Sequence, residues 1–181
     1  MQTLLEMTVN LRFSVVLVLL IVCLGVSAAD VSQDEDKLSV ARVIDRLSEA
    51  WQVGDGSAWA DEFVSDADFT VWFGFRMKGQ EDIAQGHQFI FDRFYSQTNL
   101  VIDVRQIRIL NEDAAVVHLG MSVIKEGEEP PEVPDTVPLV VLKRTDTNWK
   151  IVSFQNTPNL NGRYGDIRQF KKSLAEIETS Q

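Results

Sequence analysis

The most informative segment of the chain is Trp149-Lys150-Ile151-Val152-Ser153-Phe154-Gln155-Asn156-Thr157-Pro158. Its spacing of apolar residues is typical of a strand packed on one side, and the proline ends that strand after three polar side chains. A matching strand is predicted over residues 66–75, which are rich in aromatic and β-branched side chains. With a helix between them, the two strands predict a small, cone-shaped α+β domain with one pocket.

Apolar residues at helical spacing predict two long helices, over residues 34–53 and 80–96. Gly54-Asp55-Gly56 is expected to end the first helix, and Ser57 to cap a short helix after it. The apolar face of the second long helix comprises Ile83, Ala84, His87, Ile90, Phe91 and Phe94.

Strands dominate the rest of the chain. They are predicted over residues 100–110, 114–124, 137–144 and 149–155. A loop rich in glutamate and proline, residues 125–136, interrupts them. Strands grouped after helices indicate an α+β fold, with helices on one face of a curved antiparallel sheet.

The two ends of the chain lie outside this domain, which we expect to span residues 30–158. Residues 13–26 form an uncharged apolar run after Arg12 and before Ser27-Ala28-Ala29, a pattern typical of a signal peptide. We expect cleavage after Ala28 or Ala29, which predicts a secreted or periplasmic protein without stable membrane association. An uncleaved N-terminal anchor is the alternative. Residues 159–181 are predicted to hold a short amphipathic helix, with Ile167, Phe170, Leu174 and Ile177 at spacings of three and four.

Charge and cysteine content narrow the possible functions. The net charge of −10 disfavours binding to nucleic acid or to an anionic membrane surface. Cys23, the single cysteine, lies within the predicted leader. The exported part therefore has no disulfide, thiol nucleophile or cysteine metal site.

An ordered set of residues resembles one known family. The matching residues include Gly54-Asp55, Trp59-Ala60, Asp66-Ala67-Asp68-Phe69, Gly74, Gly79, His87, Phe91-Asp92, Asp113-Ala114-Ala115-Val116-Val117-His118, Gly120, Trp149 and Phe154-Gln155-Asn156-Thr157. Over residues 36–158 the chain resembles the SnoaL-like (DUF4440) branch of the nuclear-transport-factor-2-like superfamily, and within it the SgcJ/EcaC subgroup. The resemblance implies a cone with a pocket at its mouth, and a homodimer formed through the open face of the sheet.

The resemblance does not imply one activity, because the superfamily contains isomerases, cyclases, dehydratases, hydrolases and non-enzymes. Ketosteroid isomerase uses a tyrosine and two acidic residues. The aligned positions here hold Leu47, Val71 and Val141, so that mechanism is excluded on this alignment. No cofactor is predicted, since the chain has no Gly-rich dinucleotide loop and no flavin signature.

His87 is the leading catalytic candidate. It lies on an apolar helix face, where an imidazole could act as an acid or base near neutral pH. The alternative is a core histidine bonded to a carbonyl or carboxylate group. Asp68 is the second catalytic candidate, with an ion pair to Arg76 as its alternative.

Six further residues are predicted to contact a ligand. They are Trp72, Phe73, Phe91, His118, Gln155 and Asn156. Strand alternation predicts that Gln155 and Asn156 face opposite sides of the sheet. No metal site is predicted, because the two histidines have no carboxylate spaced to join them.

Three functions remain open at the level of sequence. The first is a cofactor-free enzyme that uses acid–base chemistry on a small, largely apolar molecule. The second is a protein that binds such a molecule without turning it over. The third is a dimeric interaction module. A polar cluster around His87 in an open cavity would favour the first, and a filled cavity the third.

Overall fold

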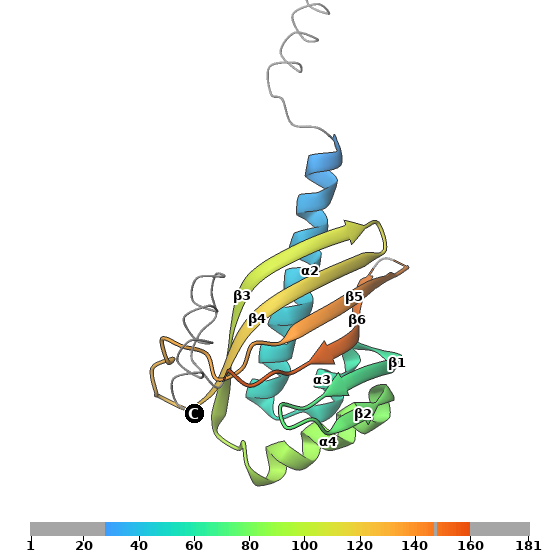
Figure 1. The fold of residues 1–181 in the computed structure, drawn as a ribbon. Helices are drawn as coiled ribbons and strands as arrows, with labels where there is room; N and C mark the ends of the chain where they lie inside the picture. Colours follow the sequence, from blue (N-terminus) through green and yellow to red (C-terminus); the bar gives the residue numbers. More distant parts are fainter. Residues whose placement is uncertain (1–27, 147, 160–181) are drawn as a thin grey trace, which may run out of the picture. The chain divides into compact units, whose positions relative to one another are not determined.

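This computed structural model describes residues 28–146 and 148–159. The elements run in the order α2 (Ala28–Val53), α3 (Gly56–Asp61), β1 (Phe63–Thr70), β2 (Arg76–Lys78), α4 (Gly79–Arg93), β3 (Thr98–Asn111), β4 (Ala114–Lys125), β5 (Leu139–Thr145) and β6 (Asn148–Gln155) (Figure 1). The second of two units, Asp36–Gln181, contains every one of these strands. Most of the predicted leader and the predicted C-terminal helix lie outside the described residues. No described helix is long and apolar enough to span a membrane.

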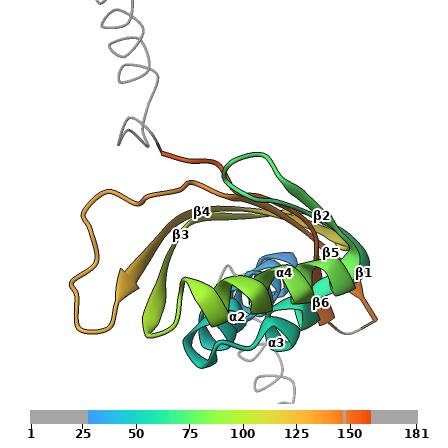
Figure 2. The same ribbon diagram turned by 90° about the horizontal axis from the view of Figure 1, so that it is seen from below.

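The strands form a six-stranded sheet in the order β2-β1-β6-β5-β4-β3. The sheet curves over α2, α3 and α4, which all lie on its concave face (Figure 2). The predicted α+β class, with helices on one face of a curved sheet, is therefore confirmed. The sheet is mixed rather than antiparallel, because β1 pairs in parallel with β6. Hydrophobic periodicity reports which face of a strand is buried, but not which neighbour the strand pairs with or in which direction.

The predicted strand over residues 66–75 is in fact a hairpin. β1 pairs with β2 in antiparallel register, with Phe69 opposite Met77. Between them the chain reverses in a turn where the Gly74 amide donates to the carbonyl of Val71. Gly74 has φ +91°, a conformation that glycine adopts without a steric cost. Trp72 consequently lies in an exposed turn rather than in a strand.

A bulge in β6 changes which of its side chains face the core. Leu142 of β5 pairs with Ile151, whereas the preceding residue, Val141, pairs with Ser153. The extra residue shifts the alternation, so Ile151 and Phe154 are both buried. Strict alternation from Ile151 would bury Ser153 and Gln155 as well, whereas Ser153 is only half-buried and Gln155 is exposed.

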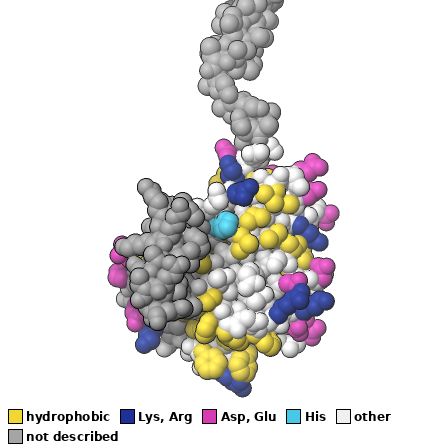
Figure 3. All heavy atoms as spheres, viewed as in Figure 1, with side chains coloured by type: hydrophobic (Ala, Val, Ile, Leu, Met, Phe, Trp, Pro, Cys, Tyr) yellow, Lys and Arg dark blue, Asp and Glu magenta, His cyan; other side chains and the backbone are white. Residues whose placement is uncertain are grey.

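The convex face of the sheet carries apolar side chains that no described helix covers. On β4, Val116 and His118 point away from the buried Val117 and are half-buried. Their partners on β5 are Val141 and Leu139. Hydrophobic side chains gather on this side of the molecule, next to a histidine (Figure 3).

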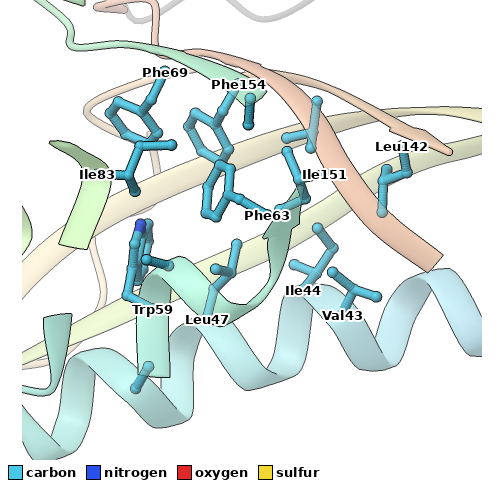
Figure 4. Packing of buried hydrophobic residues seen from close by; sticks show 14 of the residues in the cluster. Val43, Ile44, Leu47, Trp59, Phe63, Phe69, Ile83, Leu142, Ile151 and Phe154 are labelled. Carbon is cyan, nitrogen blue, oxygen red and sulfur yellow. The ribbon is translucent and has the colours of Figure 1, made fainter. Parts of the chain in front are cut away.

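The core fills the space between the concave face and the helices. Its largest side chains converge from α2, α3, α4 and the sheet (Figure 4). The short helix α3 is capped by Asp55 rather than by the predicted Ser57, because Asp55 Oδ1 accepts from the amides of Ser57 and Ala58, both at 2.9 Å. Gly54, with φ +67°, ends α2 so tightly that α3 begins two residues later. This tight connection places Trp59 in the core, where 1% of it is exposed.

Candidate functional site

A cavity of about 1090 Å³ lies on the concave side of the sheet. Nine of its lining side chains are aromatic: Trp51, Trp59, Phe69, Trp72, Phe73, Phe75, Phe89, Phe94 and Tyr95. The volume is slightly above the roughly 300–1,000 Å³ range of small-molecule pockets. The volume of the cavity and its aromatic lining together suit an apolar ligand that contains a planar group.

His87 of α4 lines this cavity and is 3% exposed. Its Nδ1 lies 2.8 Å from the carbonyl oxygen of Ile83, one turn earlier in the helix. A carbonyl oxygen only accepts, so Nδ1 carries the proton of the neutral ring and Nε2 is an acceptor. Among the described residues no group bonds to Nε2.

Aromatic rings hold the imidazole in place. The Trp59 ring stacks on it with centroids 4.5 Å apart, and Phe69 contacts it edge-on at 4.9 Å. Burial among these rings lowers the pKa of His87 from 6.5 to about 4, and the hydrogen bond to Ile83 only partly opposes this effect. His87 is therefore neutral at pH 7. The hydrogen bond to the Ile83 carbonyl is the arrangement that the sequence analysis gave as the alternative to a catalytic His87. The His87 ring nevertheless lines the cavity as well.

Some polar groups of the lining already have partners within the protein. Trp51 Nε1 donates to Thr98 Oγ1 at 3.1 Å, and Thr98 Oγ1 donates to the carbonyl of Tyr95 at 2.7 Å. In contrast, Trp59 Nε1 and Asn156 Oδ1 are buried without any hydrogen-bond partner. An unpaired buried polar atom costs about 1–3 kcal/mol. These two atoms and His87 Nε2 therefore have hydrogen-bonding capacity that the protein leaves unused.

The structure brings four of the predicted site residues together. His87, Trp72, Phe73 and Asn156 all line the cavity. Trp72 and Phe73 lie at its open side and are 53% and 64% exposed. Asn156 lines the cavity, because alternation places it on the same side as Phe154 and the β6 bulge turns that side toward the core.

The other four predicted site residues do not line the cavity. Phe91 is a core residue, 4% exposed, with its ring centroid 6.1 Å from that of His87. Gln155 is exposed, and His118 lies on the convex face of the sheet. Asp68 accepts from Arg76 Nε at 3.0 Å and from Nη2 at 2.5 Å, which is the ion pair given as its alternative.

Sequence reasoning also missed residues of the site. Trp59 is not among the site residues predicted from the sequence, although its ring both stacks on His87 and lines the cavity. Thr136 and Asp135 reach the cavity from the Glu/Pro-rich loop. Thr136 bridges Met121 and Pro158, and this long-range pairing leaves no periodic pattern in the sequence. No group of three His, Cys, Asp or Glu side chains in the described part of the chain is placed to hold a metal ion.

Comparison with solved structures establishes the fold. A domain of unknown function with a cystatin-like fold from Nostoc punctiforme superposes with a TM-score of 0.62 at 25% identity, over 86% of this chain and 98% of that chain. An NTF2-like protein with a cystatin-like fold from Novosphingobium aromaticivorans gives 0.60 at 17% identity, over 76% and 93%. The chain has the NTF2-like, cystatin-like fold.

A third structure with the NTF2-like fold has a proposed activity. It is a proposed scytalone dehydratase from Novosphingobium aromaticivorans, with a TM-score of 0.61 at 14% identity over 74% of this chain and 91% of that one. At this identity the likeness shows the fold alone. No protein-family model matches the sequence, and no curated protein matches it.

Proposed function

We propose that this NTF2-like protein binds a small, uncharged, largely apolar molecule that donates a hydrogen bond to His87 Nε2. The observation that carries the proposal is a neutral imidazole with a free acceptor nitrogen in the wall of a large aromatic cavity. The charged lining residues Lys125, Glu128 and Asp135 lie at the end of β4 and in the loop after it, and none of them acts on His87. A charged group beside His87 would therefore lose its hydration without finding a counter-charge. A molecule with a ring system and a hydroxyl or N–H group matches both features.

Binding is better supported than acid–base catalysis. A base is most effective when its pKa is near the working pH, and the pKa of His87, about 4, makes it a weak one at neutrality. Asp68, the other catalytic candidate, is paired with Arg76 away from the cavity. Turnover by His87 stays the second candidate, because a bound molecule could change the burial of the ring and because a proposed dehydratase shares the fold.

We further propose that this chain belongs to the SnoaL-like (DUF4440) branch of the superfamily and, within it, to the SgcJ/EcaC subgroup. The residues that match the pattern of that family support this placement. Export by a cleaved leader and homodimer formation belong to the same proposal. The apolar convex face around Val116, Leu139 and Val141 supports the dimer, since a sheet with apolar residues on both faces needs cover on both.

Native mass spectrometry of the protein, purified after expression of the whole chain, tests these proposals together. We expect a dimer of chains that begin at residue 29 or 30, carrying a small neutral molecule. A monomer mass at micromolar concentration would contradict the dimer. A chain that starts at Met1 or Met7 would contradict cleavage, and an empty cavity in every preparation would weaken the case for a ligand.

A His87→Phe variant should lose the preference for ligands with a hydrogen-bond donor. The pair 2-naphthol and 2-methylnaphthalene differ in one hydroxyl, and a net hydrogen bond of about 1 kcal/mol predicts a preference of roughly fivefold for 2-naphthol in the wild type. Phenylalanine keeps a stacking ring but has no acceptor, so the preference should disappear. Competition with a fluorescent apolar probe measures both affinities.

The matched control is His118→Phe, which changes the histidine on the convex face. It should keep the wild-type preference. If 2-naphthol keeps its advantage in His87→Phe, then His87 Nε2 is not the acceptor and the proposed contact is wrong.

A further inference from the structure

The phenol hydroxyl of Tyr95 is a polar group of the cavity that the proposed function does not use. Tyr95 lies two residues after the end of α4, and it lines the same cavity as His87. In the part of the chain that the structure describes, no group forms a hydrogen bond with its Oη. A phenol hydroxyl donates one hydrogen bond and also accepts. Tyr95 is half-buried, and its hydroxyl therefore has hydrogen-bonding capacity left for a ligand.

Tyr95 is held in place through both its backbone and its ring. Its amide donates to the carbonyl of Ile90 at 3.0 Å, and its ring packs against that of Trp51 with centroids 5.1 Å apart. Its carbonyl accepts from Thr98 Oγ1 at 2.7 Å, and Thr98 Oγ1 in turn accepts from Trp51 Nε1 at 3.1 Å. A ligand that contacts the phenol group would therefore not have to order it first.

Strand β4 shows at which end of the cavity Tyr95 lies. Five consecutive residues of this strand, from Met121 to Lys125, line the cavity, and a strand of this length extends about 14 Å. Lys125 pairs with Thr98 of β3, and Thr98 is bonded to the carbonyl of Tyr95. Tyr95 therefore lies at the Lys125 end of the cavity.

His87 lies toward the other end of the same run. Its ring contacts Phe69 at 4.9 Å, and Phe69 both pairs with Phe154 and stacks on it at 4.8 Å between centroids. Four residues after Phe154 the chain is bridged to Thr136, and Thr136 is bridged to Met121. The wall around His87 is thus continuous with the Met121 end of the cavity.

The separation of the two groups follows from α4 and from the rings between them. Eight residues separate His87 from Tyr95, which corresponds to about 12 Å at the rise of a helix. Two indole rings lie between the imidazole and the phenol. Trp59 stacks on His87 at 4.5 Å, Trp51 meets Trp59 at 5.8 Å, and Tyr95 follows Trp51. A molecule that contacts both groups must be elongated.

We propose that Tyr95 Oη donates a second hydrogen bond to the ligand, at the opposite end of the cavity from His87. This inference rests on the proposed function and specifies the ligand class. The ligand is an elongated, largely apolar molecule with a hydroxyl or N–H group at one end and a carbonyl or ether oxygen at the other. His87 Nε2 accepts from the first group, and Tyr95 donates to the second.

The two ends of the cavity offer a ligand different gains. His87 is 3% exposed and its Nε2 only accepts, whereas Tyr95 is half-buried. Satisfying a buried acceptor gains more than satisfying a hydroxyl that solvent also reaches. A ligand with a single hydroxyl is therefore expected at His87. Tyr95 contacts the far end of a ligand that His87 already holds, since that second contact is then intramolecular.

Two biphenyls that differ in one oxygen test the second contact. 4-Acetyl-4′-hydroxybiphenyl and 4-hydroxy-4′-isopropylbiphenyl share the hydroxyl for His87, but only the first has a carbonyl for Tyr95. Displacement of a fluorescent apolar probe measures both affinities in the wild type and in Tyr95→Phe. The affinity of the ketone relative to the isopropyl compound should fall about three- to fivefold in Tyr95→Phe. Phenylalanine keeps the ring that packs on Trp51 and loses only the donor.

A shorter pair of probes and a second variant serve as controls. 2-Acetyl-6-hydroxynaphthalene and 2-hydroxy-6-isopropylnaphthalene have the same end groups on a shorter body. Their relative affinity should be equal in the wild type and in Tyr95→Phe, because a ligand held at His87 would not reach Tyr95. His118→Phe should keep the wild-type ratio for the biphenyls, since His118 lies on the convex face. Melting curves check that both variants fold like the wild type.

The outcomes separate this inference from the proposed function. If the biphenyls bind and their relative affinity is the same in Tyr95→Phe as in the wild type, the contact at Tyr95 is wrong and the contact at His87 is untouched. A fall in the naphthalene pair as well would contradict the placement of Tyr95 at the far end. If neither biphenyl binds to the wild type, both the proposed function and this inference fail.

Discussion

A His87→Gln variant is expected to gain about 3 kcal/mol of unfolding free energy relative to the wild type when the pH falls from 7 to 4. The imidazole is bonded to the Ile83 carbonyl and packed between Trp59 and Phe69, where a positive charge would have no anionic partner. Burial therefore lowers the pKa of His87 in the folded protein to about 4, against 6.5 in the unfolded chain.

The sign of the effect depends on which state takes up the proton. Between pH 6.5 and pH 4 the unfolded chain binds a proton at residue 87 and the folded protein does not. Protonation thus pulls the equilibrium toward the unfolded state, and the wild type loses stability as the pH falls through this window. Glutamine has no proton to bind, so the variant lacks this loss.

Urea unfolding of both proteins at several pH values between 4 and 7 measures the effect. At pH 7 the variant should be the less stable of the two, because glutamine does not reproduce the stacking of the imidazole. The two stabilities should approach or cross at low pH. A His118→Gln variant controls for the loss of an imidazole elsewhere, and parallel pH profiles of wild type and His87→Gln would show that His87 is not buried as a neutral ring.

A Trp59→Ala variant is expected to lose about 3–5 kcal/mol of unfolding free energy, the usual cost of removing a buried tryptophan. Trp59 is 1% exposed, it packs edge-on against Trp51 with centroids 5.8 Å apart, and it stacks on His87. The space left behind would adjoin the cavity, so water would reach the imidazole. We therefore also expect the pKa of His87 to rise toward 6.5 in this variant.

Urea unfolding at pH 7 tests the stability change, and a histidine NMR titration tests the pKa. Trp72→Ala is the matched control, since it removes the same side chain from the exposed β1–β2 turn and should change stability by no more than about 0.5 kcal/mol. Equal losses in the two variants would contradict the placement of Trp59 in the core. A Trp59→Ala protein with an unchanged His87 pKa would show that stacking does not keep water from the ring.

Much of the fold could be predicted because local patterns report burial. The second long helix was expected over residues 80–96 and occupies Gly79–Arg93, with Ile83, His87 and Phe91 buried as its spacing indicates. The meander of β3 to β6 was predicted to within three residues at each boundary. Amphipathic spacing is a local property, so it survives in the sequence without knowledge of the partners.

The site was predicted less completely, because its residues meet through long-range contacts. His87 could be identified from the sequence because a polar residue on an apolar helix face is a local pattern. Trp59 shows no comparable local pattern in the sequence. Its ring contacts His87 only because the connection between α2 and α3 is tight. Gln155 and Asn156 were placed on opposite sides, but only the β6 bulge determined that Asn156 is the one lining the cavity.

The α+β class, the amphipathic faces of the helices and the polar group of His87 among apolar residues could all be predicted from the sequence. Each of these features depends on the spacing of side chains along a helix or strand. The folded chain was needed to establish the parallel pairing of β1 with β6, the ion pair of Asp68 with Arg76, and the tautomer and lowered pKa of His87. These features depend on desolvation and on partners that are distant in the chain. The residues next to a position in the sequence do not show its desolvation or its distant partners.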